Sequence, residues 1–195
     1  MTESASPQPP FQIRRVAVIG AGVAGRSFAL ACAAAGFTVI LEDVMPARLR
    51  HAEAEYADAN QSGAFGSLQL ASTVEEAVRE ADIAVDFVPD ELESKLEIFS
   101  MIDRMAPPKT ILCTPSYALS ITDLASCVYR PDRCFAVRGD LTARFTDIRL
   151  LYPASASKLM LAATEDFFHA LDLKLAIEPD PDAPMLMKNS PTSTR

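Results

Sequence analysis

Residues 16–25 of this 195-residue chain read V-A-V-I-G-A-G-V-A-G. Four apolar residues lead directly into glycines at positions 20, 22 and 25, and a run of small residues at helical spacing follows as far as Gly36. A second apolar run, residues 37–41, comes next. Gly36 can end the helix in a left-handed turn, so this stretch predicts a strand, a glycine turn, a helix and a second strand.

The rest of the chain continues the alternation. Further strands are expected at residues 83–87, 110–113, 134–137, 148–152 and 173–177. Helices are expected after the capping residues Thr73 and Ser120, and over residues 92–102 and 160–171. Alternating strands and helices predict the α/β class: a Rossmann-type doubly wound, mostly parallel sheet in a single domain. We place that domain at residues 13–178, between flexible tails at 1–12 and 179–195.

Composition excludes several kinds of partner. A formal net charge of −8, without a basic cluster, opposes nucleic acid. The four cysteines lack the close spacing of a metal site, and the longest apolar stretch, residues 28–41, is too short to span a membrane. The first residues carry an acid and three prolines instead of a signal peptide. We therefore expect a cytoplasmic protein with no metal, membrane or nucleic-acid partner.

The three glycines have the G-x-G-x-x-G spacing of a phosphate-binding loop. Gly20 permits a tight turn, Gly22 lets the backbone approach a pyrophosphate, and Gly25 allows the helix to pack closely on the strand. Backbone amides at the positive end of the helix then hold the phosphates. The predicted loop comprises Gly20, Ala21, Gly22, Val23, Ala24 and Gly25.

An acidic residue stands at the end of the second predicted strand. Asp43, with Glu42 beside it, follows the glycines by about twenty residues, where a carboxylate can accept hydrogen bonds from the ribose hydroxyls of NAD. The same carboxylate would repel the additional phosphate of NADP, although Arg48 and Arg50 are near enough in sequence to leave that preference open. The alternative is that the loop is kept only for packing and binds nothing.

Several stretches together resemble the N-terminal NAD-binding domain of the 3-hydroxyacyl-CoA dehydrogenases. Besides the glycine loop they are E-E-A-V-R-E-A-D-I-A-V-D-F-V-P-D-E-L-E-S-K-L-E-I-F, L-S-I-T-D-L-A and R-P-D-R, in the order of the family. The resemblance implies NAD as cofactor and a role in fatty acid metabolism. It also implies that Pro89, Asp90 and Lys95 lie beside the nicotinamide end of the cofactor.

The sequence departs from the family where proton transfer would occur. The position of the family's histidine base holds Arg138, and its partner glutamate aligns with Leu150. Tyr117 stands at the catalytic serine, with Ser116 one residue away. Arginine cannot act as a base near neutral pH. Tyr117 and Arg138 are the remaining candidates for an acid–base pair, because a nearby cation favours the phenolate.

Two functions therefore stay open. The first is an oxidoreductase on an acyl-derived hydroxyl or carbonyl substrate, with an altered or impaired site. The second is a non-catalytic NAD-binding sensor, regulatory subunit or partner subunit. The chain also ends in a Pro- and Asp-rich segment where the family continues into a helical domain, so we expect a homo-oligomer or docking to another protein.

Overall fold

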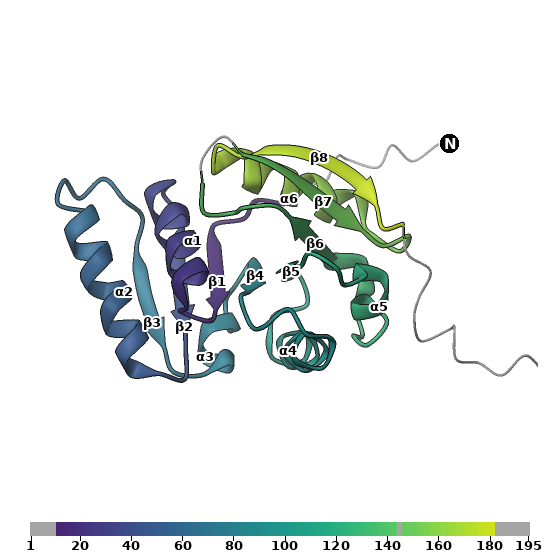
Figure 1. The fold of residues 1–195 in the computed structure, drawn as a ribbon, viewed down its shortest axis with the longest axis horizontal. Helices are drawn as coiled ribbons and strands as arrows, with labels where there is room; N and C mark the ends of the chain where they lie inside the picture. Colours follow the sequence, from purple (N-terminus) through teal and green to yellow (C-terminus); the bar gives the residue numbers. More distant parts are fainter. Residues whose placement is uncertain (1–10, 144–145, 182–195) are drawn as a thin grey trace, which may run out of the picture.

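The protein folds around one eight-stranded sheet with helices on both faces. A computed structural model describes residues 11–143 and 146–181. The strand order is β3-β2-β1-β4-β5-β6-β7-β8, and all neighbours are parallel except β6 and β7 (Figure 1). The strands are β1 (Arg15–Ile19), β2 (Thr38–Glu42), β3 (Leu68–Ala71), β4 (Ile83–Asp86), β5 (Ile111–Pro115), β6 (Cys134–Arg138), β7 (Asp147–Tyr152) and β8 (Lys174–Pro179). The predicted Rossmann-type sheet is confirmed.

Six helices and one short 3-10 turn connect these strands. They are α1 (Val23–Ala34), α2 (Pro46–Ala59), α3 (Val74–Val78), α4 (Leu92–Met105), α5 (Ile121–Ala125), η1 (Pro131–Arg133) and α6 (Lys158–Ala170). On one face the buried side chains include Phe28 of α1 and Phe167 of α6. On the other face they include Phe99 of α4 and Leu124 of α5. Both faces of the sheet are thus covered, as the continuous apolar runs of its strands require.

Predicted helix ends are confirmed at three positions. The Thr73 side chain accepts a hydrogen bond from the Glu76 amide at 3.3 Å, and the Ser120 side chain accepts one from the Asp123 amide at 3.2 Å. Gly36 has φ of +92°, a conformation that a residue with a side chain rarely adopts, and it follows the end of α1. The sequence alone predicts these helix ends because each depends only on a few neighbouring residues.

The structure differs from the sequence expectations at β3 and at the end of β8. β3 was not predicted, because it lies at the edge of the sheet and its partly exposed residues lack a continuous apolar run. β8 extends through Pro179, and the Asp180 carboxylate accepts a hydrogen bond from the Ser120 hydroxyl at 2.6 Å. The packed part of the chain therefore passes the boundary placed at residue 178. Most of the two predicted tails lies outside the described residues.

Candidate functional site: a cofactor cavity beside an altered catalytic position

A cavity lies where β1, β2 and β4 end. Its volume is about 520 Å³, and the residues that line it are Ile19, Gly20, Gly22, Glu42, Asp43, Val44, Arg48, Val74, Phe87, Val88, Pro89 and Ile98. Four residues singled out from the sequence meet here: Gly20, Gly22, Asp43 and Pro89. The carboxyl edge of a parallel sheet is where Rossmann domains bind dinucleotides.

Each glycine of the loop is needed for a different reason. Gly20 has φ of +101°, and a Cβ on it would meet the Phe87 carbonyl oxygen at 3.3 Å. A Cβ on Gly25 would overlap the Gly20 carbonyl oxygen, so the helix can approach the loop only because residue 25 has no side chain. A Cβ on Gly22 would have no protein atom within 4 Å. No protein atom in the described structure requires glycine at position 22, and an approaching pyrophosphate supplies a reason.

The first turn of α1 is free to bind an anion. Its N-cap, Gly22, provides no side-chain hydrogen bond, and the first turn carries no acidic residue. The first helical hydrogen bond runs from the Arg26 amide to the Gly22 carbonyl at 2.9 Å, so the preceding amides have no acceptor within the helix. Val23 is 75% exposed. The chain thus presents unpaired amides and a positive helix end to the cavity, which fits a pyrophosphate.

Asp43 forms part of the loop as well as the cavity wall. One carboxylate oxygen accepts from the Ala21 amide at 2.8 Å, and the other accepts from the Met45 amide at 2.8 Å. Arg48 lies 3.2 Å from the same carboxylate. Although burial alone would raise it, the pKa of Asp43 is lowered by these hydrogen bonds and by Arg48. The carboxylate is therefore ionised and oriented before any ligand arrives.

A second side chain holds the loop from the opposite side. The Arg26 guanidinium donates to the Ala21 carbonyl at 3.3 Å and forms an ion pair with Glu55 of α2 at 3.1 Å. Both backbone groups of Ala21, its amide and its carbonyl, thus have side-chain partners. Ala21 itself is fully buried. It contributes to the predicted loop through its backbone, whereas Val23 and Ala24 are exposed at the start of α1.

Glu42 is an acidic residue of the cavity that was not selected from the sequence. It is 4% exposed, and its carboxyl receives no hydrogen bond from the described residues. Burial, together with the neighbouring charge of Asp43, raises the pKa of Glu42 to about 7. The sequence does contain a sign that Glu42 is unusual. It directly continues the run T-V-I-L at residues 38–41, at a position where a buried strand normally has an apolar residue.

The segment expected near the nicotinamide is divided between surface and interior. Pro89 lines the cavity. Asp90 is exposed and accepts a hydrogen bond from the Tyr117 amide at 2.9 Å. Lys95 is 1% exposed and pairs with the fully buried Asp86 at 2.7 Å. Lys95 is therefore not one of the residues that line the cavity. It forms a buried ion pair with Asp86 at the end of β4, the strand that ends beside the cavity.

The candidate proton-transfer residues follow neighbouring strands. The Ser116 amide donates to the Val137 carbonyl at 3.0 Å, which brings the chain before Tyr117 beside the chain before Arg138. The Tyr117 side chain is nevertheless 76% exposed. The Arg138 Nε is buried, and no hydrogen-bond partner for it is found in the described part of the chain. In the same described region, no hydrogen bond or ion pair joins the two side chains, so their expected pairing stays a prediction.

The other residues aligned with the proton-transfer group are structural here. Leu150, at the position of the family's glutamate, is fully buried in β7 opposite Val137. Ser116 is 2% exposed, and its hydroxyl accepts from the Leu119 amide at 3.0 Å. Neither residue offers a free ionisable group to a substrate.

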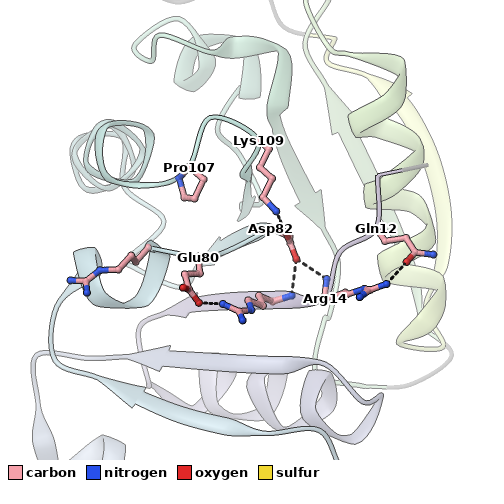
Figure 2. Close-up of a pocket in the computed structure, with 8 residues that line it drawn as sticks. Gln12, Arg14, Glu80, Asp82, Pro107 and Lys109 are labelled. Carbon is pink, nitrogen blue, oxygen red and sulfur yellow. Dashed lines mark hydrogen bonds and ion pairs between the residues drawn. The ribbon is translucent and has the colours of Figure 1, made fainter. Parts of the chain in front are cut away.

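A second cavity, of about 550 Å³, lies where β1 and β4 begin, at the ends of these strands opposite the glycine loop (Figure 2). At its centre the Asp82 carboxylate accepts from the Lys109 ammonium at 2.6 Å and from the Arg14 and Arg15 amides at 2.9 and 3.0 Å. Arg15 in turn pairs with Glu80. Both acids of this cavity, Asp82 and Glu80, are thus already paired with cations, and the cavity lies away from the glycine loop. We therefore assign the cofactor to the cavity at the carboxyl edge.

Comparison with known proteins identifies an NAD-binding domain in this chain. Residues 15–138 match the family described as 3-hydroxyacyl-CoA dehydrogenase, NAD binding domain. A probable 3-hydroxybutyryl-CoA dehydrogenase of Bacillus subtilis (strain 168) is 32% identical over 135 residues, which are 63% of this chain and 47% of the relative. An L-carnitine dehydrogenase of Oceanobacillus iheyensis is 31% identical over 130 residues, covering 62% and 42%. The chain thus spans about half the length of the curated relatives it matches.

Solved structures support the same fold. The 3-hydroxyacyl-CoA dehydrogenase of Archaeoglobus fulgidus superposes with a TM-score of 0.75 at 23% identity, over 90% of this chain and 59% of that one. No helix among the described residues is long and apolar enough to cross a membrane. The family match covers residues 15–138, and the glycine loop leaves space for a phosphate beside Gly22. The chain therefore belongs to the 3-hydroxyacyl-CoA dehydrogenase family and carries its NAD-binding domain.

Proposed function

We propose that this chain binds NAD(H) and that its own residues do not support the proton transfer of a 3-hydroxyacyl-CoA dehydrogenase. The observation that carries the proposal is the contrast between two neighbouring regions. The loop, the start of α1 and Asp43 are arranged to receive a dinucleotide. Arg138 and the buried Leu150 occupy the positions aligned with the family's base and its partner acid.

The chemistry explains why these substitutions matter. Oxidation of a hydroxyl to a carbonyl by NAD⁺ moves a hydride to the nicotinamide and requires a base for the hydroxyl proton. An arginine guanidinium stays protonated, and a leucine has no group to hold a base in place. Loss of general base catalysis alone lowers a rate by about 10²–10⁴. A cofactor-binding sensor, regulatory subunit or partner subunit is the role that this arrangement supports best.

A second candidate is an oxidoreductase that acts on a hydroxyacyl-type substrate through an altered site. It is favoured by the adjacency of the strand ends before Tyr117 and Arg138 and by the unpartnered Nε of Arg138 in the described structure. In this candidate the Tyr117 phenolate takes the hydroxyl proton while the hydride passes to NAD⁺. Arg138 would stabilise the phenolate.

Two measurements separate these functions. NADH binding is followed by the fluorescence of its reduced nicotinamide, and Gly22→Ala should weaken it at least tenfold because the new methyl group occupies only cofactor space. Glu53→Gln, at an exposed residue of α2 that does not line the cavity, is the control. Turnover of 3-hydroxybutyryl-CoA with NAD⁺ should be undetectable. If weak turnover is found, its loss in Tyr117→Phe with NADH binding intact identifies the second candidate.

Wild-type protein that fails to bind NADH would contradict the proposal. Robust turnover that survives both Tyr117→Phe and Arg138→Ala would contradict it as well, because the base would then lie elsewhere in the protein.

A further inference from the structure

The Glu42 carboxyl is a buried acid without a partner inside the cofactor cavity. It is 4% exposed, receives no hydrogen bond from the described residues, and lines the cavity. The carboxyl of this otherwise buried residue thus opens onto the cavity, where a bound ligand can supply a hydrogen bond that the described protein residues do not. Unlike Asp43, Glu42 has no amide or cation bound to it, so its acceptor oxygens remain available to a ligand.

The register of the sheet gives the direction of the Glu42 side chain. Glu42 of β2 is paired with Ile19 of β1 in parallel register, so both side chains leave the sheet on the same face. Ile19 packs in the core layer formed with Phe99 and Ala77, on the side of α3 and α4. Glu42 therefore lies on the α3 side of the cavity, beside Val74.

The rest of the cavity wall indicates which part of a dinucleotide this acid meets. The glycine loop receives the pyrophosphate, and Asp43 stands where the adenosine ribose binds. Next to Asp43 and Glu42 the lining includes the apolar side chains Val44 and Val74, together with Arg48, which is paired with Asp43. Apolar walls with one hydrogen-bond acceptor suit a flat base that has apolar faces and an amino group on its edge.

We propose that Glu42 recognises the adenine base, by accepting a hydrogen bond from its exocyclic amino group. The inference rests on the proposed function, because it requires a dinucleotide in this cavity. A carboxyl oxygen accepts such a hydrogen bond whether or not the group is protonated. While Glu42 is ionised, a 6-oxopurine instead presents a carbonyl oxygen at the same position and leaves Glu42 facing a second acceptor, so the two purines are compared at pH 8.5. Glu42 is thus a specificity residue for a 6-aminopurine dinucleotide.

The test compares NADH with reduced nicotinamide hypoxanthine dinucleotide. The two share the nicotinamide, both riboses and the pyrophosphate, and differ only in the purine, where a 6-oxo group and N1–H replace the amino group and unprotonated N1 of adenine. The chain has no tryptophan, so the fluorescence of the reduced nicotinamide can be followed without interference. A hydrogen bond to an acidic group predicts about 10- to 100-fold tighter binding of NADH by the wild-type protein.

Glu42→Leu should abolish this preference by weakening NADH binding while the hypoxanthine dinucleotide binds as before or better. Glu42→Gln keeps the size of the side chain and can donate to a 6-oxo group, so the preference for NADH over the hypoxanthine dinucleotide should be smaller in this variant too. Glu53→Gln, at an exposed acid of α2, is the matched control and should keep the full preference.

Equal affinity of the wild-type protein for the two dinucleotides would overturn this inference while leaving the proposed function standing. A preference that survives in both Glu42 variants would do the same. Failure of the wild-type protein to bind either dinucleotide would overturn the inference and the proposed function together.

Discussion

Replacing Glu42 with glutamine should stabilise the protein, and by more at alkaline than at acidic pH. The pKa of Glu42 rises from an ordinary 4.5 to about 7 because burial and the charge of Asp43 disfavour its ionised form. An acid whose pKa is raised on folding costs nothing below its unfolded pKa. Its cost grows as the pH rises toward the folded pKa and is complete above it. Glutamine has no such cost.

The magnitude follows from the difference in pKa. A shift of one pKa unit corresponds to about 1.4 kcal/mol, so the full cost of ionised Glu42 is about 3 kcal/mol above pH 8. At pH 5.5 the same relation leaves a cost of about 1.4 kcal/mol, because the folded protein then keeps Glu42 protonated and the cost is only that of binding a proton which the unfolded chain has mostly released. The stabilising effect of Glu42→Gln should therefore grow by about 2 kcal/mol between pH 5.5 and 8.5. Asp43 and Arg48 are the charged residues that line the cavity with Glu42, and the lowered pKa of Asp43 keeps that carboxylate ionised across this range.

Urea unfolding followed by far-ultraviolet circular dichroism measures this effect, since the chain has no tryptophan to report it. Wild type, Glu42→Gln and the exposed control Glu53→Gln are compared at each pH, so that other titrating groups cancel. A difference between wild type and Glu42→Gln that does not vary with pH would refute the reasoning. So would a Glu42→Gln protein that is less stable than wild type at pH 8.5.

Four further outcomes are expected. Gly25→Ala should lower the free energy of unfolding by about 3 kcal/mol or more in thermal or urea unfolding, because the new methyl group overlaps the Gly20 carbonyl. Lys95→Met should cost about 3–5 kcal/mol by leaving Asp86 buried without its cation, and most of that loss should return when Asp86 is also made apolar. Arg48→Ala should widen the preference for NADH over NADPH in fluorescence titrations by removing the cation beside Asp43, whereas Arg50→Ala, at an exposed position, should not. Self-association through the sheet edges at β3 and β8 is expected in light scattering, and a clean monomer would contradict it.

Sequence reasoning identified the fold because its signals were local. The glycine loop, the apolar strands and the caps at Thr73 and Ser120 each depend on residues within a few positions of one another. β3 was missed because this edge strand is partly exposed and its sequence L-Q-L-A lacks the continuous apolar run of a buried strand such as β4, which is equally short. The end of β8 was placed early because E-P-D-P reads as a polar tail, whereas Asp180 is held by Ser120, sixty residues earlier in the chain.

The candidate site was only partly predictable, because much of it depends on contacts between distant segments. Asp43 was identified from its spacing to the glycines, but its hydrogen bond to the Ala21 amide required the loop to fold back onto β2. Lys95 was assigned from the family resemblance, and its burial against Asp86 emerged only with the packing of α4 on the sheet. The relation between the Tyr117 and Arg138 side chains likewise depends on two loops that the sequence does not orient.

The bonds around Ala21 have a consequence for how fast a cofactor can enter. Its amide is held by Asp43 and its carbonyl by Arg26, and both side chains belong to elements that are already packed. The phosphate-binding turn therefore has little freedom left to lose, and no loop needs to become ordered before the ligand is captured. Stopped-flow mixing should accordingly show one association phase whose rate rises linearly with NADH concentration, without the plateau that a slow rearrangement imposes.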